Sequence, residues 1–170
     1  MGQPSHFRAC IRALGVAVAS SVIIGSLVHA ATPKKLNAFA EGDRLVYTRL
    51  VESFRKNERD QVLRQRALLE RNYPNSIHLD NAYYLSGMAE YQHERYGEAV
   101  RAFGTVRERF PRSNKRPAAL FALGVTYEKL GLQPQAIGVW RQLIKEYPGS
   151  MESRRAEMHL ELEKSASRKK

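Results

Sequence analysis

Three copies of a short motif recur along the chain at a fixed spacing, and this recurrence limits the possible folds more than any other feature. Each copy is an aromatic residue followed by proline, any residue and serine, at 73–76, 110–113 and 147–150. Successive copies lie 37 residues apart. Self-similarity with a period of about 20–50 residues marks a repeat protein, in which each unit buries its apolar face against its neighbours.

Small and bulky residues between the motifs follow the same period. The matched pairs, each separated by 37 residues, are Gly87 and Gly124, Ala99 and Ala136, Phe103 and Trp140, and Val106 and Leu143. Glycine and alanine let two antiparallel helices approach closely, and a bulky residue fills the space against the next pair. Proline cannot continue a helix, so each motif marks the end of one. The pattern therefore predicts stacked helix-turn-helix units.

This order of small, bulky and proline positions resembles the tetratricopeptide (TPR) repeat, whose usual period is about 34 residues. The extra residues fall in the turn after the proline, around 113–116. With that longer turn, the stretch 81–160 is similar to the TPR domains of two kinds of bacterial periplasmic protein. These are the cell-division coordinator of the Tol-Pal system and the TPR lipoprotein of the outer-membrane barrel assembly machine. Segments 118–124 and 144–150 carry most of the similarity.

We therefore predict an all-α, TPR-like α-solenoid domain over 42–164, with three repeats of 37 residues, a C-terminal capping helix and a basic tail at 165–170. The expected helices are 42–56, 59–73, 77–94, 96–110, 116–130, 133–147 and 151–164. Asn57 and Gly131 are expected to end helices, and Ser76 and Ser150 to cap the helices that follow them. Repeat 1 is degenerate, because Arg66 stands where the later repeats have an aromatic residue.

The first 30 residues have the pattern of a secretory signal peptide. Arg8 and Arg12 precede an uncharged run over 13–27, and Ala30 provides a small residue at the cleavage position. An uncleaved membrane anchor is the alternative, although the run is short for spanning. We expect cleavage after Ala30, a periplasmic product and a disordered linker at 31–41. Cys10, the single cysteine, would leave with the signal peptide.

The charge is strongly positive, with a formal net charge of +11, which becomes +9 when Arg8 and Arg12 are removed. A basic exported protein favours anionic partners, such as lipid head groups, cell-wall carboxylates or acidic protein faces. Ordinary solvated helix faces would explain the same charge. Nucleic acid is excluded as a partner if the chain is exported.

The first helix of each TPR repeat lines the concave face, so the resemblance also predicts a partner-binding groove. One register position gives a ladder 37 residues apart, formed by Tyr47, Tyr84, Phe121 and Met158. The predicted partner-binding residues are Arg44, Tyr47, Arg55, Asn81, Tyr84, Met88, Tyr91, Phe121 and Val125. Aromatic and methionine side chains suit a peptide or helix lying in a groove, and Arg44 or Arg55 would meet its negative group. The alternative is that these aromatic residues only pack between helices.

Catalytic and metal-binding patterns are absent from the sequence. There is no glycine-rich phosphate loop and no serine flanked as a nucleophile elbow, and His78, His93 and His159 lack metal-ligand spacing. We expect no cofactor and no enzymatic activity. The resemblance implies an adaptor for protein partners in cell-envelope maintenance or division. An assembly factor for outer-membrane proteins, and an accessory subunit of an envelope enzyme or secretion machine, remain the alternatives.

Overall fold

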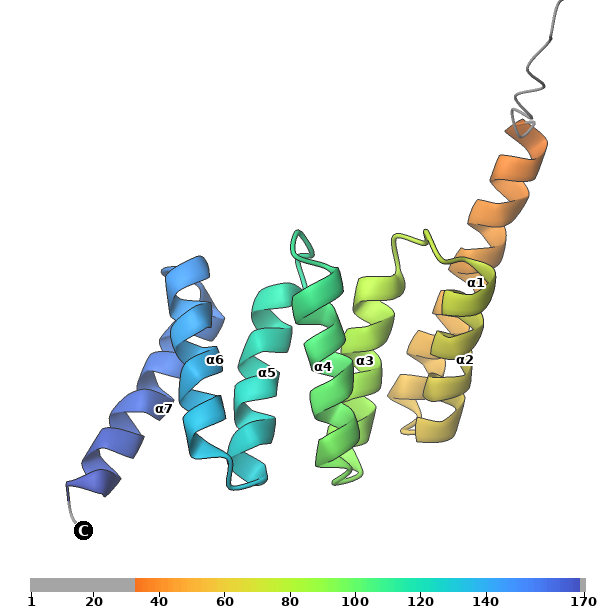
Figure 1. Cartoon of the computed structure of the whole chain (residues 1–170). Helices are drawn as coiled ribbons and strands as arrows, with labels where there is room; N and C mark the ends of the chain where they lie inside the picture. The colour runs from red at the N-terminus through yellow and green to blue at the C-terminus, as the bar shows by residue number, and fades with distance from the viewer. Residues whose placement is uncertain (1–32, 169–170) are drawn as a thin grey trace, which may run out of the picture. The chain divides into compact units, whose positions relative to one another are not determined.

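Residues 33–168 of the computed structural model form seven α-helices and, within that range, no strand (Figure 1). The helices are α1 Pro33–Arg55, α2 Arg59–Asn72, α3 Leu79–Gln92, α4 Tyr96–Arg109, α5 Arg116–Lys129, α6 Gln133–Glu146 and α7 Met151–Ser167. The predicted signal peptide lies outside the described residues, as do 31, 32, 169 and 170. The all-α prediction is confirmed, and the predicted ends of α2 to α6 agree with the structure to within two residues.

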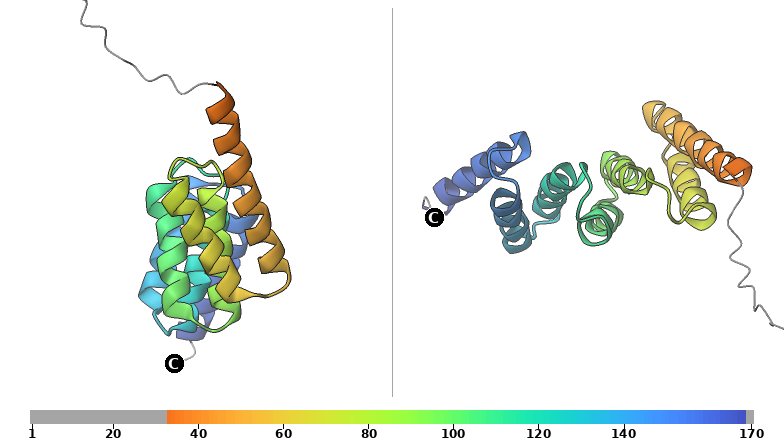
Figure 2. Two further views of the ribbon diagram at one scale, coloured as in Figure 1. Left: turned by 90° about the vertical axis from the view of Figure 1, so that its right-hand side faces the viewer. Right: turned by 90° about the horizontal axis from the view of Figure 1, so that it is seen from above.

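The helices alternate between two rows. Seen from above, α1, α3, α5 and α7 lie along one side and α2, α4 and α6 along the other (Figure 2). Each odd-numbered helix contacts the next odd-numbered helix, whereas within residues 33–168 neither α2 and α4 nor α4 and α6 are in contact. The odd-numbered row is therefore the more closely packed, concave side of a helical-pair solenoid.

Two glycines set the distance between the helices of repeats 2 and 3. A Cβ added to Gly87 would lie 2.6 Å from Phe103 Cε1, and one added to Gly124 would lie 2.6 Å from Trp140 Cδ1. Both rings are fully buried. The predicted register, in which each glycine lets an aromatic ring from the next helix pack against the backbone, is confirmed.

The turn after the first helix of each repeat uses the same backbone conformation. Asn57, Glu94 and Gly131 have φ of 58°, 59° and 72° and lie 37 residues apart. This left-handed region favours glycine and tolerates asparagine. The helix breaks expected at Asn57 and Gly131 are thus explained, while Glu94 adopts a conformation that is unfavourable for its side chain.

The linker prediction at the start of the domain is wrong where the structure describes it, because α1 begins at Pro33. Proline suits the first turn of a helix, and the residues that follow are mainly lysine, leucine, alanine and glutamate, which favour helix. Gly42, the expected first residue, lies inside α1, where a Cβ would sit 2.9 Å from Tyr73 Cζ. The tail prediction also needs correction, since α7 extends to Ser167.

The motif serines act in two different ways. Ser76 Oγ donates to Asp43 Oδ2 at 2.7 Å, and Ser113 Oγ donates to Asp80 Oδ2 at 2.5 Å, so each serine ties its loop to the first helix of the preceding repeat. Ser76 Oγ also accepts the amide hydrogen of His78 at 3.2 Å, but α3 begins at Leu79 with His78 in the N-cap position, so Ser76 is not the N-cap predicted for it. Ser150 does cap the helix that follows it, as predicted, because its Oγ accepts the amide hydrogen of Ser153, the third residue of α7, at 3.1 Å.

Apolar residues form two hydrophobic clusters that meet at α3. The first joins α1, α2 and one side of α3, and its largest fully buried members are Leu50, Leu69 and Leu79. The second contains Tyr83 of α3 with residues of α4 to α7. Phe110 packs against both clusters. The core of repeat 1 is thus distinct from that of repeats 2 and 3.

Candidate functional site

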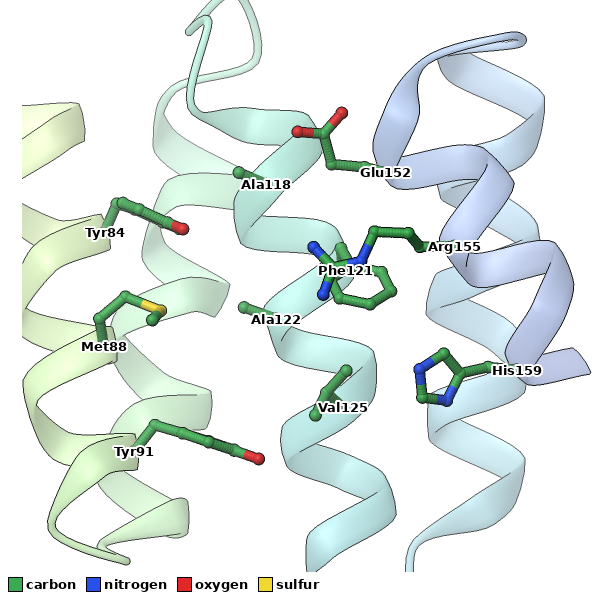
Figure 3. A pocket seen from close by; sticks show the side chains of 10 residues that line it. All are labelled: Tyr84, Met88, Tyr91, Ala118, Phe121, Ala122, Val125, Glu152, Arg155 and His159. Atoms are coloured by element: carbon green, nitrogen blue, oxygen red, sulfur yellow. The ribbon is translucent and has the colours of Figure 1, made fainter.

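A pocket of about 380 Å³ opens on the concave side formed by the odd-numbered helices, between α3, α5 and α7 (Figure 3). Its lining combines aromatic, methionine and small apolar side chains with one acidic and one basic residue. The lining residues are Tyr84, Met88, Tyr91, Ala118, Phe121, Ala122, Val125, Glu152, Arg155 and His159.

Helical periodicity explains the α3 wall. Tyr84, Met88 and Tyr91 are separated by four and then three residues, which places them on one face of α3. All three are partly buried, and their side chains extend toward α5 in the close view (Figure 3). The Tyr84 ring lies 5.9 Å from the Phe103 ring, and the Tyr91 ring lies 5.4 Å from the Tyr96 ring. Phe103 and Tyr96 of α4 therefore support the α3 side chains that line the pocket.

Phe121 of α5 forms the bottom of the pocket, and only 7% of this residue is exposed. The Arg155 guanidinium of α7 lies over this ring, with 4.1 Å between Cζ and the ring centroid (Figure 3). His159, one turn further along α7, lies 4.7 Å from the Trp140 ring and 5.7 Å from the Phe121 ring, measured between centroids. Its Nδ1 lies 3.4 Å from Glu128 Oε2. The capping helix therefore supplies one complete side of the pocket.

Arg155 and Glu152 give the pocket its charge. Among residues 33–168, neither side chain forms an ion pair or a hydrogen bond, and Arg155 is exposed. A cation that stacks on an aromatic face keeps its hydrogen-bond donors free for a ligand. Burial raises the pKa of Tyr84, and the Glu152 carboxylate raises it further while Arg155 opposes the change. The Tyr84 hydroxyl thus stays protonated and can donate to a ligand.

The structure brings together five of the nine residues predicted for partner binding, namely Tyr84, Met88, Tyr91, Phe121 and Val125. The other four do not line the pocket. Arg44 and Arg55 are exposed on α1. Tyr47 stacks on His78 at 4.3 Å between ring centroids, and its hydroxyl accepts a hydrogen bond from Asn81 Nδ2. Tyr47 and Asn81 therefore join α1 to α3, as the packing alternative expects.

Sequence reasoning missed the contribution of α7. Glu152, Arg155 and His159 line the pocket, whereas Met158 was the one residue of this helix expected on the concave ladder and the helix was otherwise expected to cap repeat 3. The repeat period contained the signal, because Arg155 lies two periods of 37 residues after Asn81, which was assigned to the groove. Within the described residues, no group of three or more His, Cys, Asp and Glu side chains is placed to hold a metal ion.

The repeats match a known family. The tetratricopeptide repeat model matches residues 81–113 and 118–150. The chain therefore contains tetratricopeptide repeats. The two matched segments cover repeats 2 and 3 from the third residue of α3 and of α5 through the motif that follows each repeat, and they include the α3 and α5 walls of the pocket.

A solved TPR-like structure supports the fold beyond these two segments. The N-terminal domain of stress-induced protein-1 (STI-1) from C. elegans superposes with a TM-score of 0.61 and 11% sequence identity. The superposition covers 72% of this chain and 97% of that domain. At this identity the similarity establishes the all-α TPR-like solenoid and nothing finer. No curated protein matches the sequence.

The TPR fold is typical of scaffolds that hold other proteins, since stacked repeats build extended concave surfaces. Between residues 33 and 168, none of the helices combines the length and apolar character needed to cross a bilayer. The apolar run at 13–27 lies outside the described residues.

Proposed function

We propose that this chain is an exported, non-enzymatic TPR adaptor that holds a segment of a partner protein in the groove between α3, α5 and α7. One observation carries the proposal: an aromatic and methionine-lined groove stands open beside an arginine whose donors are free. Concave TPR surfaces of this kind accommodate an extended peptide or a helix.

The groove favours a particular kind of segment. Tyr84, Met88 and Val125 offer apolar contacts, and methionine adapts to side chains of different shape. Arg155 can donate two parallel hydrogen bonds to a carboxylate. The partner segment is therefore apolar with a carboxylate placed to reach Arg155. Glu152, on the same wall, would disfavour a second carboxylate nearby.

We further propose that the adaptor works in the periplasm and serves envelope maintenance or division, as in the Tol-Pal system. The uncharged run 13–27 with Ala30 supports export, and the similarity of 118–124 and 144–150 to periplasmic TPR proteins supports the envelope context. The net charge of +9 for the cleaved chain suits the anionic surroundings of the envelope.

The test compares two charge reversals. Arg155→Glu places a negative charge in the groove, and Arg101→Glu makes the same change on α4, where the Arg101 side chain is 73% exposed. Hydrogen bonds to charged groups contribute about 1.5–3 kcal/mol, so Arg155→Glu is expected to weaken partner binding by at least about tenfold. Both variants are first checked for native circular dichroism, and each is used to capture proteins from an envelope extract.

A captured protein band that is lost with Arg155→Glu but not with Arg101→Glu, and that is weakened by salt, supports binding in the groove. A Tol-Pal component in that band supports the specific role, whereas a barrel-assembly component points to an assembly factor. Bands that are the same with both variants would contradict the groove assignment.

Export is tested separately by N-terminal sequencing of the protein from fractionated cells. We expect a chain that starts at Ala31 in the periplasmic fraction. An intact Met1 in the membrane fraction would contradict cleavage and favour a tethered protein.

A further inference from the structure

Helix α7 carries a stripe of exposed apolar side chains. Met151, Met158 and Leu162 are 66%, 58% and 67% exposed, and they account for three of the seven exposed large hydrophobic residues in the described part of the chain. Their spacings of seven and four residues place them on one face of the helix. Scattered surface hydrophobics are ordinary, but a row on one helix face marks an interaction surface.

The repeat register explains why no described helix covers this face of α7. Tyr47, Tyr84, Phe121 and Met158 occupy the same position in successive repeats, 37 residues apart. Tyr47 stacks on His78, just before α3, and accepts a hydrogen bond from Asn81 of α3. Tyr84 borders the pocket, and Phe121 is covered by α7. Among the described helices, α7 contacts only α5 and α6, so none takes the corresponding place on Met158. A further helix packed against Met158 would repeat the contacts that α3 makes with Tyr47 and that α7 makes with Phe121.

The charges beside the stripe show which helix fits. Arg154 lies near the start of α7 and Glu161 near its end, and both are exposed. In an antiparallel pair of α7 helices, Met151 would face Leu162 of the second copy and Arg154 would face Glu161. The centre of each pairing along α7 falls between Ala156 and Met158. One two-fold axis through this part of the helix therefore relates both pairs of residues. Antiparallel helices of the same sequence are therefore complementary in apolar contacts and in charge.

We propose that the α7 face is a self-association surface through which two copies of this chain form an antiparallel dimer. Each pairing then occurs twice, as an isologous interface requires. In the single chain, Glu161 pairs with Lys164 at 2.5 Å, and Arg154 donates to the Gly149 carbonyl at 3.1 Å. Exposed contacts of this kind are weak and can be exchanged for contacts across the dimer. The proposal does not rest on the groove ligand, although Arg155, four residues after Met151 and three before Met158, borders both the groove and this stripe.

The experiment measures the mass of the protein, as purified from the cells that produce it, by sedimentation equilibrium over a wide range of concentration. Wild type is expected to show a reversible monomer–dimer equilibrium. Met158→Glu should weaken the dimer by at least about tenfold, whereas Ile77→Glu should leave it unchanged. Ile77, 84% exposed in the loop before α3, is the matched control for losing an exposed apolar residue. Circular dichroism checks that each variant is folded.

Charge reversals test the antiparallel arrangement itself. Arg154→Glu or Glu161→Arg alone should weaken the dimer, because each variant places like charges opposite one another. Mixing the two single variants should restore association, since every pairing then joins opposite charges. A monomeric wild type, an equal loss with Ile77→Glu, or no restoration on mixing would each overturn the proposal.

Discussion

The contact between Gly124 and Trp140 provides a sharp test of the helix packing. A Cβ at position 124 would lie 2.6 Å from both Cδ1 and Cε2 of the buried indole ring, closer than real Cβ atoms approach. The ring is fully buried and rigid, so Gly124→Ala must displace the ring or separate α5 from α6. Overpacking of this kind costs about 1–3 kcal/mol, and contact with several ring atoms places this site near the upper end.

Helix propensity acts in the opposite direction, because alanine is favoured over glycine by about 1 kcal/mol inside a helix. Gly138→Ala isolates this gain, since a Cβ at that position in α6 meets nothing within 4 Å. We therefore expect Gly124→Ala to lower the free energy of unfolding by about 2 kcal/mol and Gly138→Ala to raise it by about 1 kcal/mol.

Urea unfolding followed by tryptophan fluorescence measures both variants, and Trp140, the single tryptophan, reports directly on repeat 3. Free energies of unfolding for the two variants within about 0.5 kcal/mol of each other, the range of ordinary surface substitutions, would refute the packing argument. A double-mutant cycle adds a second check by circular dichroism. Trp140→Leu should partly offset Gly124→Ala, because the smaller side chain leaves room for the new methyl group.

Two further predictions concern the turns and the charged junction between repeats. Glu94→Gly should raise the free energy of unfolding by about 0.5–1 kcal/mol by removing a side chain from a left-handed conformation, and Gly131→Ala should lower it by about 1 kcal/mol, both measured by urea unfolding. For Glu70, burial opposes ionisation, but hydrogen bonds from Arg109 at 2.7 Å and Tyr83 at 2.6 Å outweigh it and lower the pKa of the carboxyl group. A lowered folded-state pKa stabilises the fold above the ordinary carboxyl pKa near 4.5, and this stabilisation is lost as the pH falls below that value. Glu70→Gln should therefore reduce the loss of stability on acidification, and equal pH profiles for variant and wild type would contradict this assignment.

The sequence predicted most of the fold because the repeat period reflects backbone geometry. Gly87 and Gly124 were identified by their spacing from an aromatic residue, and the structure places both against the expected rings. Glu94 was missed because its residue type does not favour a left-handed turn. The period would have found it, since it lies midway between Asn57 and Gly131.

The site was predicted less completely because long-range contacts decide which side chains remain free. Tyr47 and Tyr84 hold the same register position, yet Tyr47 is engaged by α3, whereas Tyr84 borders an open pocket. Arg44 and Arg55 were assigned to the groove by their place on the first helix, and the structure leaves both exposed on α1, outside the pocket. Arg155 is the arginine at the pocket, and only the packing of α7 against α5 places it over Phe121.

The separation of the hydrophobic core into two clusters has a mechanical consequence. Between α2 and α3, buried Glu90 accepts hydrogen bonds from Arg59 at 2.7 and 3.0 Å, and the Arg66 guanidinium lies 4.8 Å from the Tyr83 ring centroid. Repeat 1 is therefore attached through directional polar contacts as well as apolar ones. Such contacts hold over a short range of displacement and then fail together. A load applied to the start of the domain should thus peel off α1 and α2 as one step, while the groove between α3, α5 and α7 keeps its shape.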